Sequence, residues 1–248
     1  MPLSPRVAAA QDAPPPREVN HQAFAWIGLF TTHRFGDHWG VTTDFLIQRN
    51  RFLKEPGLYW LRLGGGYWFN DRISLHLALA KLWAYVPQLR NSDFTTENRV
   101  DAQILATSTL GNFLVVQRFR TDLRWREIVA GDETTARVFS IRPRYLASFT
   151  LPVSRNPRVP LPMVASEILV QFGTGLANNT FDQFRIFVGI SHRLGKGFSY
   201  DFGYFQIFSR TAGGAVYNAN HTLRFLMYFG TRNAGPDINA AAIDMGYE

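Results

Sequence analysis

The chain has 248 residues, no cysteine and a formal net charge of +7 at neutral pH. Without cysteine it cannot form disulfides, thiolate metal sites or a thiol nucleophile. No run approaches the roughly 18 apolar residues of a transmembrane helix. Many arginines alternate with apolar residues and acids instead of gathering on one basic face, so we expect no nucleic-acid partner. The length suits a single all-β barrel domain.

The two ends differ from the rest of the chain. Residues 1–21 contain three consecutive prolines, which cannot donate to a strand ladder. The alanines at 8–10 are typical of the small-residue end of a secretory signal whose hydrophobic stretch is missing. We predict a leader or signal-peptide remnant here, with an ordinary disordered leader as the alternative. Residues 231–248 are rich in Gly, Ala and Asn and predict a flexible tail.

Between residues 22 and 230, apolar and polar side chains alternate, as in strands that separate two environments. In 113–126, for example, Phe119 and Trp125 lie on one face, whereas arginines and an aspartate lie on the other. The predicted strands are 22–35, 38–50, 57–69, 72–85, 95–108, 113–127, 135–150, 162–172, 182–194, 198–208 and 218–230.

The predicted connections alternate in length, so tight turns gather at one end of the barrel and loops at the other. A proline-rich link at 151–161 is the exception, because a short turn is expected there. Single-chain bacterial barrels close with an even number of strands, so we predict about twelve strands, with about ten as the fallback. Short turns are expected at 36–37, 70–71, 111–112 and 195–197, and longer links at 51–56, 86–94, 128–134, 173–181 and 209–217.

The apolar faces carry almost no charge in mid-strand, where a lipid-facing charge would cost about 2–4 kcal/mol. A soluble lipocalin-like barrel, by contrast, would turn its apolar faces inward. We therefore predict a closed antiparallel transmembrane β-barrel over 22–230, with a polar, arginine-rich lumen. Its location would be the bacterial outer membrane, where lipid and lipopolysaccharide would contact a monomeric barrel.

Seven stretches of the predicted barrel carry a resemblance to a known family. They are AFAWIGLFTTHRFGDHWGVTTDFLIQR, GGGYWFNDRISLHLALA, ENRVDAQILATSTLGNFLVVQRFRTDLRWRE, FSIRPRYLASFTLPV, ASEILVQFG, FDQFRIFVGISHRLGKGFSYDFGYFQ and NHTLRFLMYF. In their order and spacing they resemble an uncharacterised outer-membrane family, the domain of unknown function 2490. The resemblance implies an outer-membrane barrel in a Gram-negative cell, and it implies no activity or catalytic residues.

The candidate site is the charged face of five consecutive strands. One interpretation is structural: arginines and carboxylates fill the lumen and satisfy each other. The other is a constriction that selects anionic solutes. Glu167 is a lone acid on an apolar segment and should meet Arg144 or Arg185. The predicted lumen residues are Glu97, Asp101, Arg118, Arg120, Asp122, Arg124, Arg126, Arg142, Arg144, Glu167 and Arg185.

These patterns predict a small porin-like channel for polar or anionic solutes, or a structural component of the envelope. A lipid hydrolase and a barrel subunit of an envelope complex are the alternatives. Ser74 and His76 share a face, but they lie beside a short turn at the expected periplasmic end, and the sequence offers no convincing set of nucleophile, base and orienting residue. We expect no enzymatic activity, no cofactor and no metal site.

Overall fold

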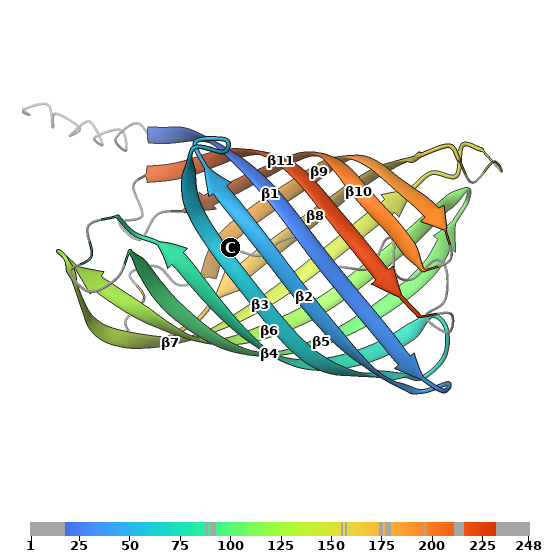
Figure 1. Cartoon of the computed structure of the whole chain (residues 1–248), viewed down its shortest axis with the longest axis horizontal. Helices are drawn as coiled ribbons and strands as arrows, with labels where there is room; N and C mark the ends of the chain where they lie inside the picture. The colour runs from blue at the N-terminus through green and yellow to red at the C-terminus, as the bar shows by residue number, and fades with distance from the viewer. Residues whose placement is uncertain are drawn as a thin grey trace, which may run out of the picture.

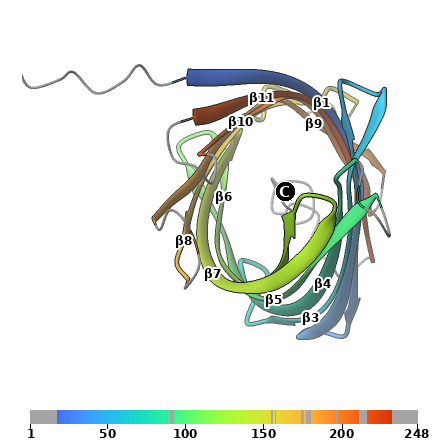
Figure 2. The same cartoon turned by 90° about the vertical axis from the view of Figure 1, so that its left-hand side faces the viewer.

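The computed structural model describes residues 18–231 apart from 88, 90–92, 155, 157, 174, 175, 177–179, 196 and 211–215. Within this part of the chain, eleven strands follow one another around a closed barrel (Figures 1 and 2). They are β1 (Glu18–Phe35), β2 (Trp39–Asn50), β3 (Glu55–Trp68), β4 (Ile73–Tyr85), β5 (Phe94–Leu110), β6 (Phe113–Ala130), β7 (Glu133–Thr150), β8 (Leu161–Gln171), β9 (Thr180–Gly195), β10 (Phe198–Arg210) and β11 (Val216–Gly230).

The barrel closes through a parallel pair of strands, β1 and β11. The predicted count of twelve, with ten as fallback, is therefore wrong, and the sheet is mixed instead of wholly antiparallel. With an odd number of up-and-down strands, the first and last run in the same direction, so their pairing must be parallel. The register runs from Glu18↔Val216 to Thr32↔Gly230, which covers nearly all of β1 and leaves no long free edge. Each segment predicted individually corresponds to one strand, and only the assumption of an even number added another.

Two predicted boundaries at the chain ends shift. β1 begins at Glu18, so the last four residues of the predicted leader belong to a strand. The rest of that leader lies outside the described residues. Thr231, the first residue of the predicted tail, donates its amide to the Thr32 carbonyl at 3.1 Å. Residues 232–248 also lie outside the described part.

The connection predicted as a longer link at 128–134 is a tight turn instead. β6 continues to Ala130 and β7 starts at Glu133, with Gly131 at a φ of 67°. Glycine adopts this left-handed conformation without steric cost, which allows the two-residue turn. Residues 130–137 are exposed on both faces. The β6–β7 hairpin therefore extends past neighbouring strands at this end (Figure 1).

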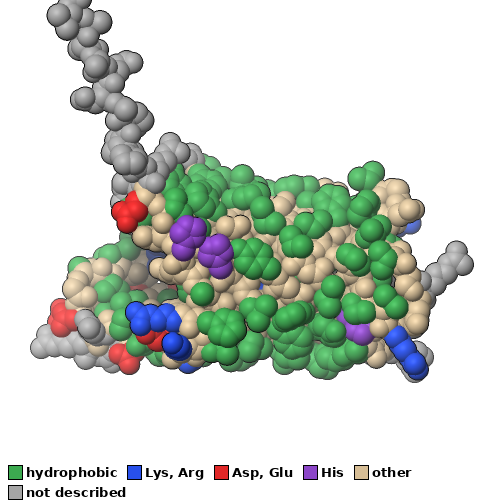
Figure 3. Space-filling model, turned by 90° about the horizontal axis from the view of Figure 1, so that it is seen from above, with side chains coloured by type: hydrophobic (Ala, Val, Ile, Leu, Met, Phe, Trp, Pro, Cys, Tyr) green, Lys and Arg blue, Asp and Glu red, His purple; other side chains and the backbone are tan. Residues whose placement is uncertain are grey.

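Exposed apolar side chains lie along the length of the outer wall, as the face drawn in Figure 3 shows. Leu63 is 61% exposed, and Leu77 and Leu79 on β4 are 59% and 66% exposed. Aromatic side chains contact one another near the strand ends, as in the Trp39–Tyr67 and Trp125–Phe139 pairs. This distribution follows from the two-residue period, because every second side chain of a strand faces outward.

The interior is filled by two kinds of side chain. One is charged and comes mainly from β5–β9. The other is an apolar cluster that the sequence pattern did not predict, so the polar, arginine-rich lumen expected from the sequence accounts for only part of the interior. In β1, residues 24–30 are apolar on both faces, and Trp26 and Phe30 therefore turn apolar groups inward. Its aromatic members are Phe24, Trp26, Phe30, Trp60, Phe187, Phe205 and Tyr228, and its aliphatic members include Leu46 and Leu226.

Candidate functional site

The predicted lumen residues lie on β5–β9, and strand alternation turns them to the inner side of the wall. Register brings Asp122 beside both Asp101 and Arg142, and Glu167 beside Arg185. Ten of the eleven predicted side chains are buried. Arg126 is the exception: it is half-buried near the strand end and lines a cavity there.

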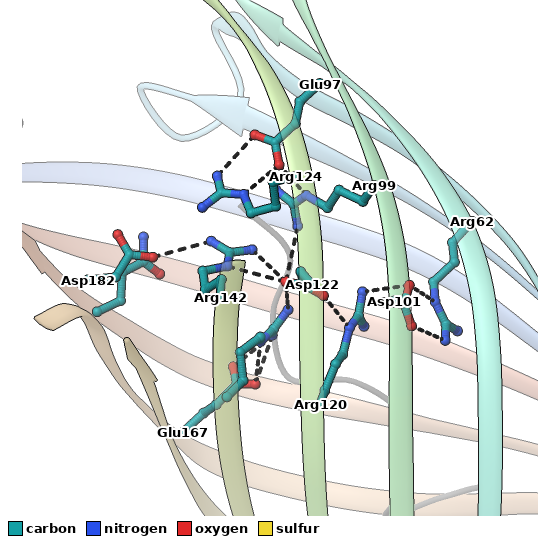
Figure 4. Close-up of polar contacts among 12 residues, drawn as sticks. Arg62, Glu97, Arg99, Asp101, Arg120, Asp122, Arg124, Arg142, Glu167 and Asp182 are labelled. Atoms are coloured by element: carbon teal, nitrogen blue, oxygen red, sulfur yellow. Dashed lines mark hydrogen bonds and ion pairs between the residues drawn. The ribbon is translucent and has the colours of Figure 1, made fainter. Parts of the chain in front are cut away.

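Asp122 is the centre of the buried ion pairs (Figure 4). Its carboxylate accepts from Arg120 Nε at 2.7 Å and Arg142 Nη2 at 3.0 Å. Arg144 Nη1 lies 3.4 Å away and Arg99 Nη1 3.8 Å away. One carboxylate therefore compensates several guanidinium groups, and charge-assisted hydrogen bonds of this kind are among the stronger ones in proteins.

Glu167 forms a second centre. It accepts two hydrogen bonds from Arg144, both 2.9 Å long, in a bidentate arrangement. Arg185 Nη1 lies 3.1 Å from Oε2, and Arg118 Nη2 lies 2.7 Å from Oε1. Both expected partners, Arg144 and Arg185, thus contact this lone acid, together with Arg118.

Further residues, which the sequence pattern did not predict, extend these ion pairs around the barrel. Arg62 on β3 donates to Asp101 at 2.8 and 3.0 Å and to Asp44 on β2 at 2.8 Å. It reaches β5 across β4, where Ala78 and Ala80 face inward and leave room. The sequence signal was a lone charge between Leu61 and Leu63, which a strict count of inward positions would have found.

At the other side, Arg142 Nη1 lies 3.3 Å from Asp182 on β9. Ion pairs therefore link strands from β2 to β9, and we call this set the interior network. Its members are Asp44, Arg62, Glu97, Arg99, Asp101, Arg118, Arg120, Asp122, Arg124, Arg142, Arg144, Glu167, Asp182 and Arg185.

Positive charge exceeds negative charge inside the barrel. Ten arginines but only seven acids are buried among the described residues. Aromatic rings stabilise part of this excess: the Arg224 guanidinium lies 3.7 Å from the Phe187 ring centroid, and Arg99 lies 4.7 Å from that of Trp60. The contact between Arg99 and Trp60 therefore joins the interior network to the apolar cluster.

Ser74 and His76, the two residues considered for hydrolysis, do not belong to the interior network. His76 Nε2 lies 2.9 Å from Ser74 Oγ, and both side chains are buried. Nδ1 of His76 has no hydrogen-bond partner among the described residues. A catalytic histidine needs such a partner to hold its tautomer. In the described part of the chain, no group of three or more His, Asp or Glu residues could hold a metal ion.

These features define a class of protein: a closed, mixed, eleven-stranded β-barrel with an apolar exterior and an ion-paired interior. The family model described as "Protein of unknown function (DUF2490)" matches residues 24–218, so the chain belongs to this family, as the resemblance predicted. No curated protein matches it. No helix in the described ranges is long and apolar enough to cross a membrane.

One solved structure with a similar fold is the β domain of the Bordetella autotransporter Brka. The two chains are 12% identical, with a TM-score of 0.50, and the match covers 80% of this chain and 86% of that one. At this identity the similarity shows the fold alone. The shared architecture is that of an outer-membrane-type β-barrel.

Proposed function

We propose that this chain is a monomeric outer-membrane β-barrel of a Gram-negative bacterium that is sealed by its own side chains. Its role would be structural, as an embedded component of the envelope in contact with lipid and lipopolysaccharide. The exposed leucines of the outer wall support this location, since lipid selects against charge there. Aromatic contacts near the strand ends fit the headgroup regions of a bilayer.

The observation that carries the sealed barrel is the burial of its interior. Arg120, Asp122 and Arg142 of the interior network are each 0% exposed, and so are Phe187 and Phe205 of the apolar cluster. A fully buried side chain leaves no water-sized space beside it. A solute would have to separate buried ion pairs, and an unpaired buried charge costs about 3–5 kcal/mol.

Two measurements test this proposal. The folded protein should migrate differently in a gel before and after boiling in detergent, as a stable barrel does. In planar bilayers it should show no steady conductance, whereas Asp122→Ala should open intermittent steps because four arginines lose their common partner. Steady conductance by the wild-type protein would contradict the sealed barrel.

A porin-like channel for small anions is the second candidate, supported by the excess of buried arginine over buried acid. It requires the interior network to rearrange during conduction. Discrete steps with anion preference, weakened in Arg120→Ala and Arg124→Ala, would establish it. Equal permeability to cations and anions would count against it.

A lipid hydrolase has less support. Ser74 and His76 are hydrogen-bonded, but they are buried together, and His76 has no orienting partner among the described residues. We expect the folded protein to release no fatty acid from phospholipid or lipid A. Release by the wild type that disappears in Ser74→Ala would reverse this expectation.

A role as a barrel subunit of an envelope complex would instead appear as co-purification with a defined partner.

A further inference from the structure

We infer that one mouth of the barrel holds a binding site for a small amphipathic anion, that is, a carboxylate or phosphate with a compact apolar body. The site is a cavity of about 180 Å³ at the ends of β3, β4, β5 and β6. Described side chains alone form this site, and ligand binding there does not require the barrel to conduct. Its lining residues are Leu58, Leu82, Ala84, Thr95, Thr96, Glu97, Arg99, Arg124 and Arg126.

One wall of the cavity is cationic and rigidly held. Arg124 donates to both oxygens of Glu97, at 2.6 and 3.0 Å, and Arg99 donates to the same carboxylate. The Arg99 guanidinium lies 4.7 Å from the ring centroid of Trp60, and this cation–π contact also holds it in place. These contacts fix two guanidinium groups before any ligand arrives, so little side-chain entropy is lost on binding.

The third arginine supplies charge without a partner. Arg126 is half-buried, and its side chain forms no ion pair or hydrogen bond with any described residue. Glu127, the next residue, is already engaged by the Thr96 amide at 2.6 Å and by Arg137 at 3.1 Å. Three arginines and one acid therefore line the cavity, and the local excess of positive charge favours an anion.

The apolar part of the lining, which adjoins the charged part, limits the shape of the ligand. Leu58 and Leu82 belong to the apolar cluster, and Ala84 packs against it. A fully hydrated inorganic ion would leave this surface without contact. A dry cavity of about 150 Å³ holds a benzene molecule, so this volume suits an anion of about the size of benzoate. An apolar body against the leucines and a charged head toward the arginines would use both walls.

The experiment uses the full chain folded in a non-ionic detergent, because an anionic detergent would compete. Calorimetric titration with benzoate should give saturable binding. Benzamide has the same shape without the charge, and inorganic phosphate has charge without the apolar body. Both should bind at least about tenfold more weakly, since a hydrogen bond to a charged group and burial of a ring each contribute that much.

Two variants test the position of the site. Arg126→Gln removes the unpaired charge and should weaken benzoate about tenfold, with folding checked by the shift on boiling. Ala84→Leu fills the apolar side of the cavity and should also weaken the binding of benzoate. Arg193→Gln, which changes an exposed arginine at the opposite end of the barrel, is the matched control and should bind as wild type. Three outcomes would overturn the inference. Benzoate could show no saturable binding, or benzoate and benzamide could bind with equal affinity. The third outcome is an equal loss of benzoate affinity in Arg126→Gln and Arg193→Gln.

Discussion

Arg144 on β7 and Glu167 on β8 form a bidentate pair, with Nε to Oε1 and Nη2 to Oε2 both 2.9 Å. Arg118 on β6 and Arg185 on β9 reach the same carboxylate. A single acid therefore joins four strands that are adjacent in the wall. Loss of its charge would leave buried cations without compensation, which makes this position a sensitive probe of the interior network.

Replacing Glu167 with Gln should lower the free energy of unfolding by about 3–5 kcal/mol, because breaking a buried ion pair leaves an unpaired charge. Urea unfolding followed by fluorescence of the six tryptophans measures the change. The control is Glu55→Gln, which removes the partner of Arg51 in an exposed pair. That change should cost no more than about 1 kcal/mol. Equal effects of the two substitutions would show that the network adds nothing to stability.

Replacing Leu79 with Arg tests whether lipid covers the outer wall. Leu79 is 66% exposed, and an arginine at mid-bilayer should cost about 2–4 kcal/mol of folding free energy in vesicles. Leu53→Arg, in the β2–β3 turn, is the matched control and should cost about 1 kcal/mol or less. If water surrounded the barrel, Leu79→Arg would be as harmless as the control, and a membrane location would be ruled out.

The parallel β1–β11 pair requires the chain to enter and leave the barrel at opposite ends. The wild-type chain has no cysteine, so Glu18→Cys and Thr231→Cys each provide a single reactive thiol. Short periplasmic turns are the rule in such barrels. Thr231 lies at the end of the barrel that carries short turns such as the one between β1 and β2, whereas Glu18 lies at the other end. We therefore expect a membrane-impermeant maleimide to label Glu18→Cys on intact cells and Thr231→Cys only after the outer membrane is permeabilised. Labelling of both from one side would mean an even number of strands.

A pair of glycines shapes the apolar half of the interior. Gly189 on β9 faces Gly203 on β10 in register, and a Cβ on Gly203 would lie 2.5 Å from Gly189 Cα and 3.0 Å from the Phe187 ring. Gly203→Ala should therefore destabilise the barrel by about 1–3 kcal/mol through overpacking. Gly65→Ala is the control, because a Cβ there would meet nothing within 4 Å. Equal midpoints of thermal unfolding for the two variants would refute the close approach.

Much of the candidate site could be predicted from local pattern. Charged side chains at every second position of β6 indicated one polar face, and the isolation of Glu167 indicated arginine partners. Arg62 and Asp44 were not predicted, because each is a single charge between uncharged neighbours in its strand. Arg62 donates to Asp44 on the adjacent strand and to Asp101 across β4, and no local pattern contains the second contact.

The sequence by itself determined the strands and their two faces, because side-chain alternation is a property of each strand alone. Only the tertiary structure decided that eleven strands close through a parallel pair, that aromatic side chains share the interior with arginines, and that a cavity remains at one mouth. These features depend on the register and stagger of strands far apart in the chain, since barrel closure links strand number, tilt and diameter.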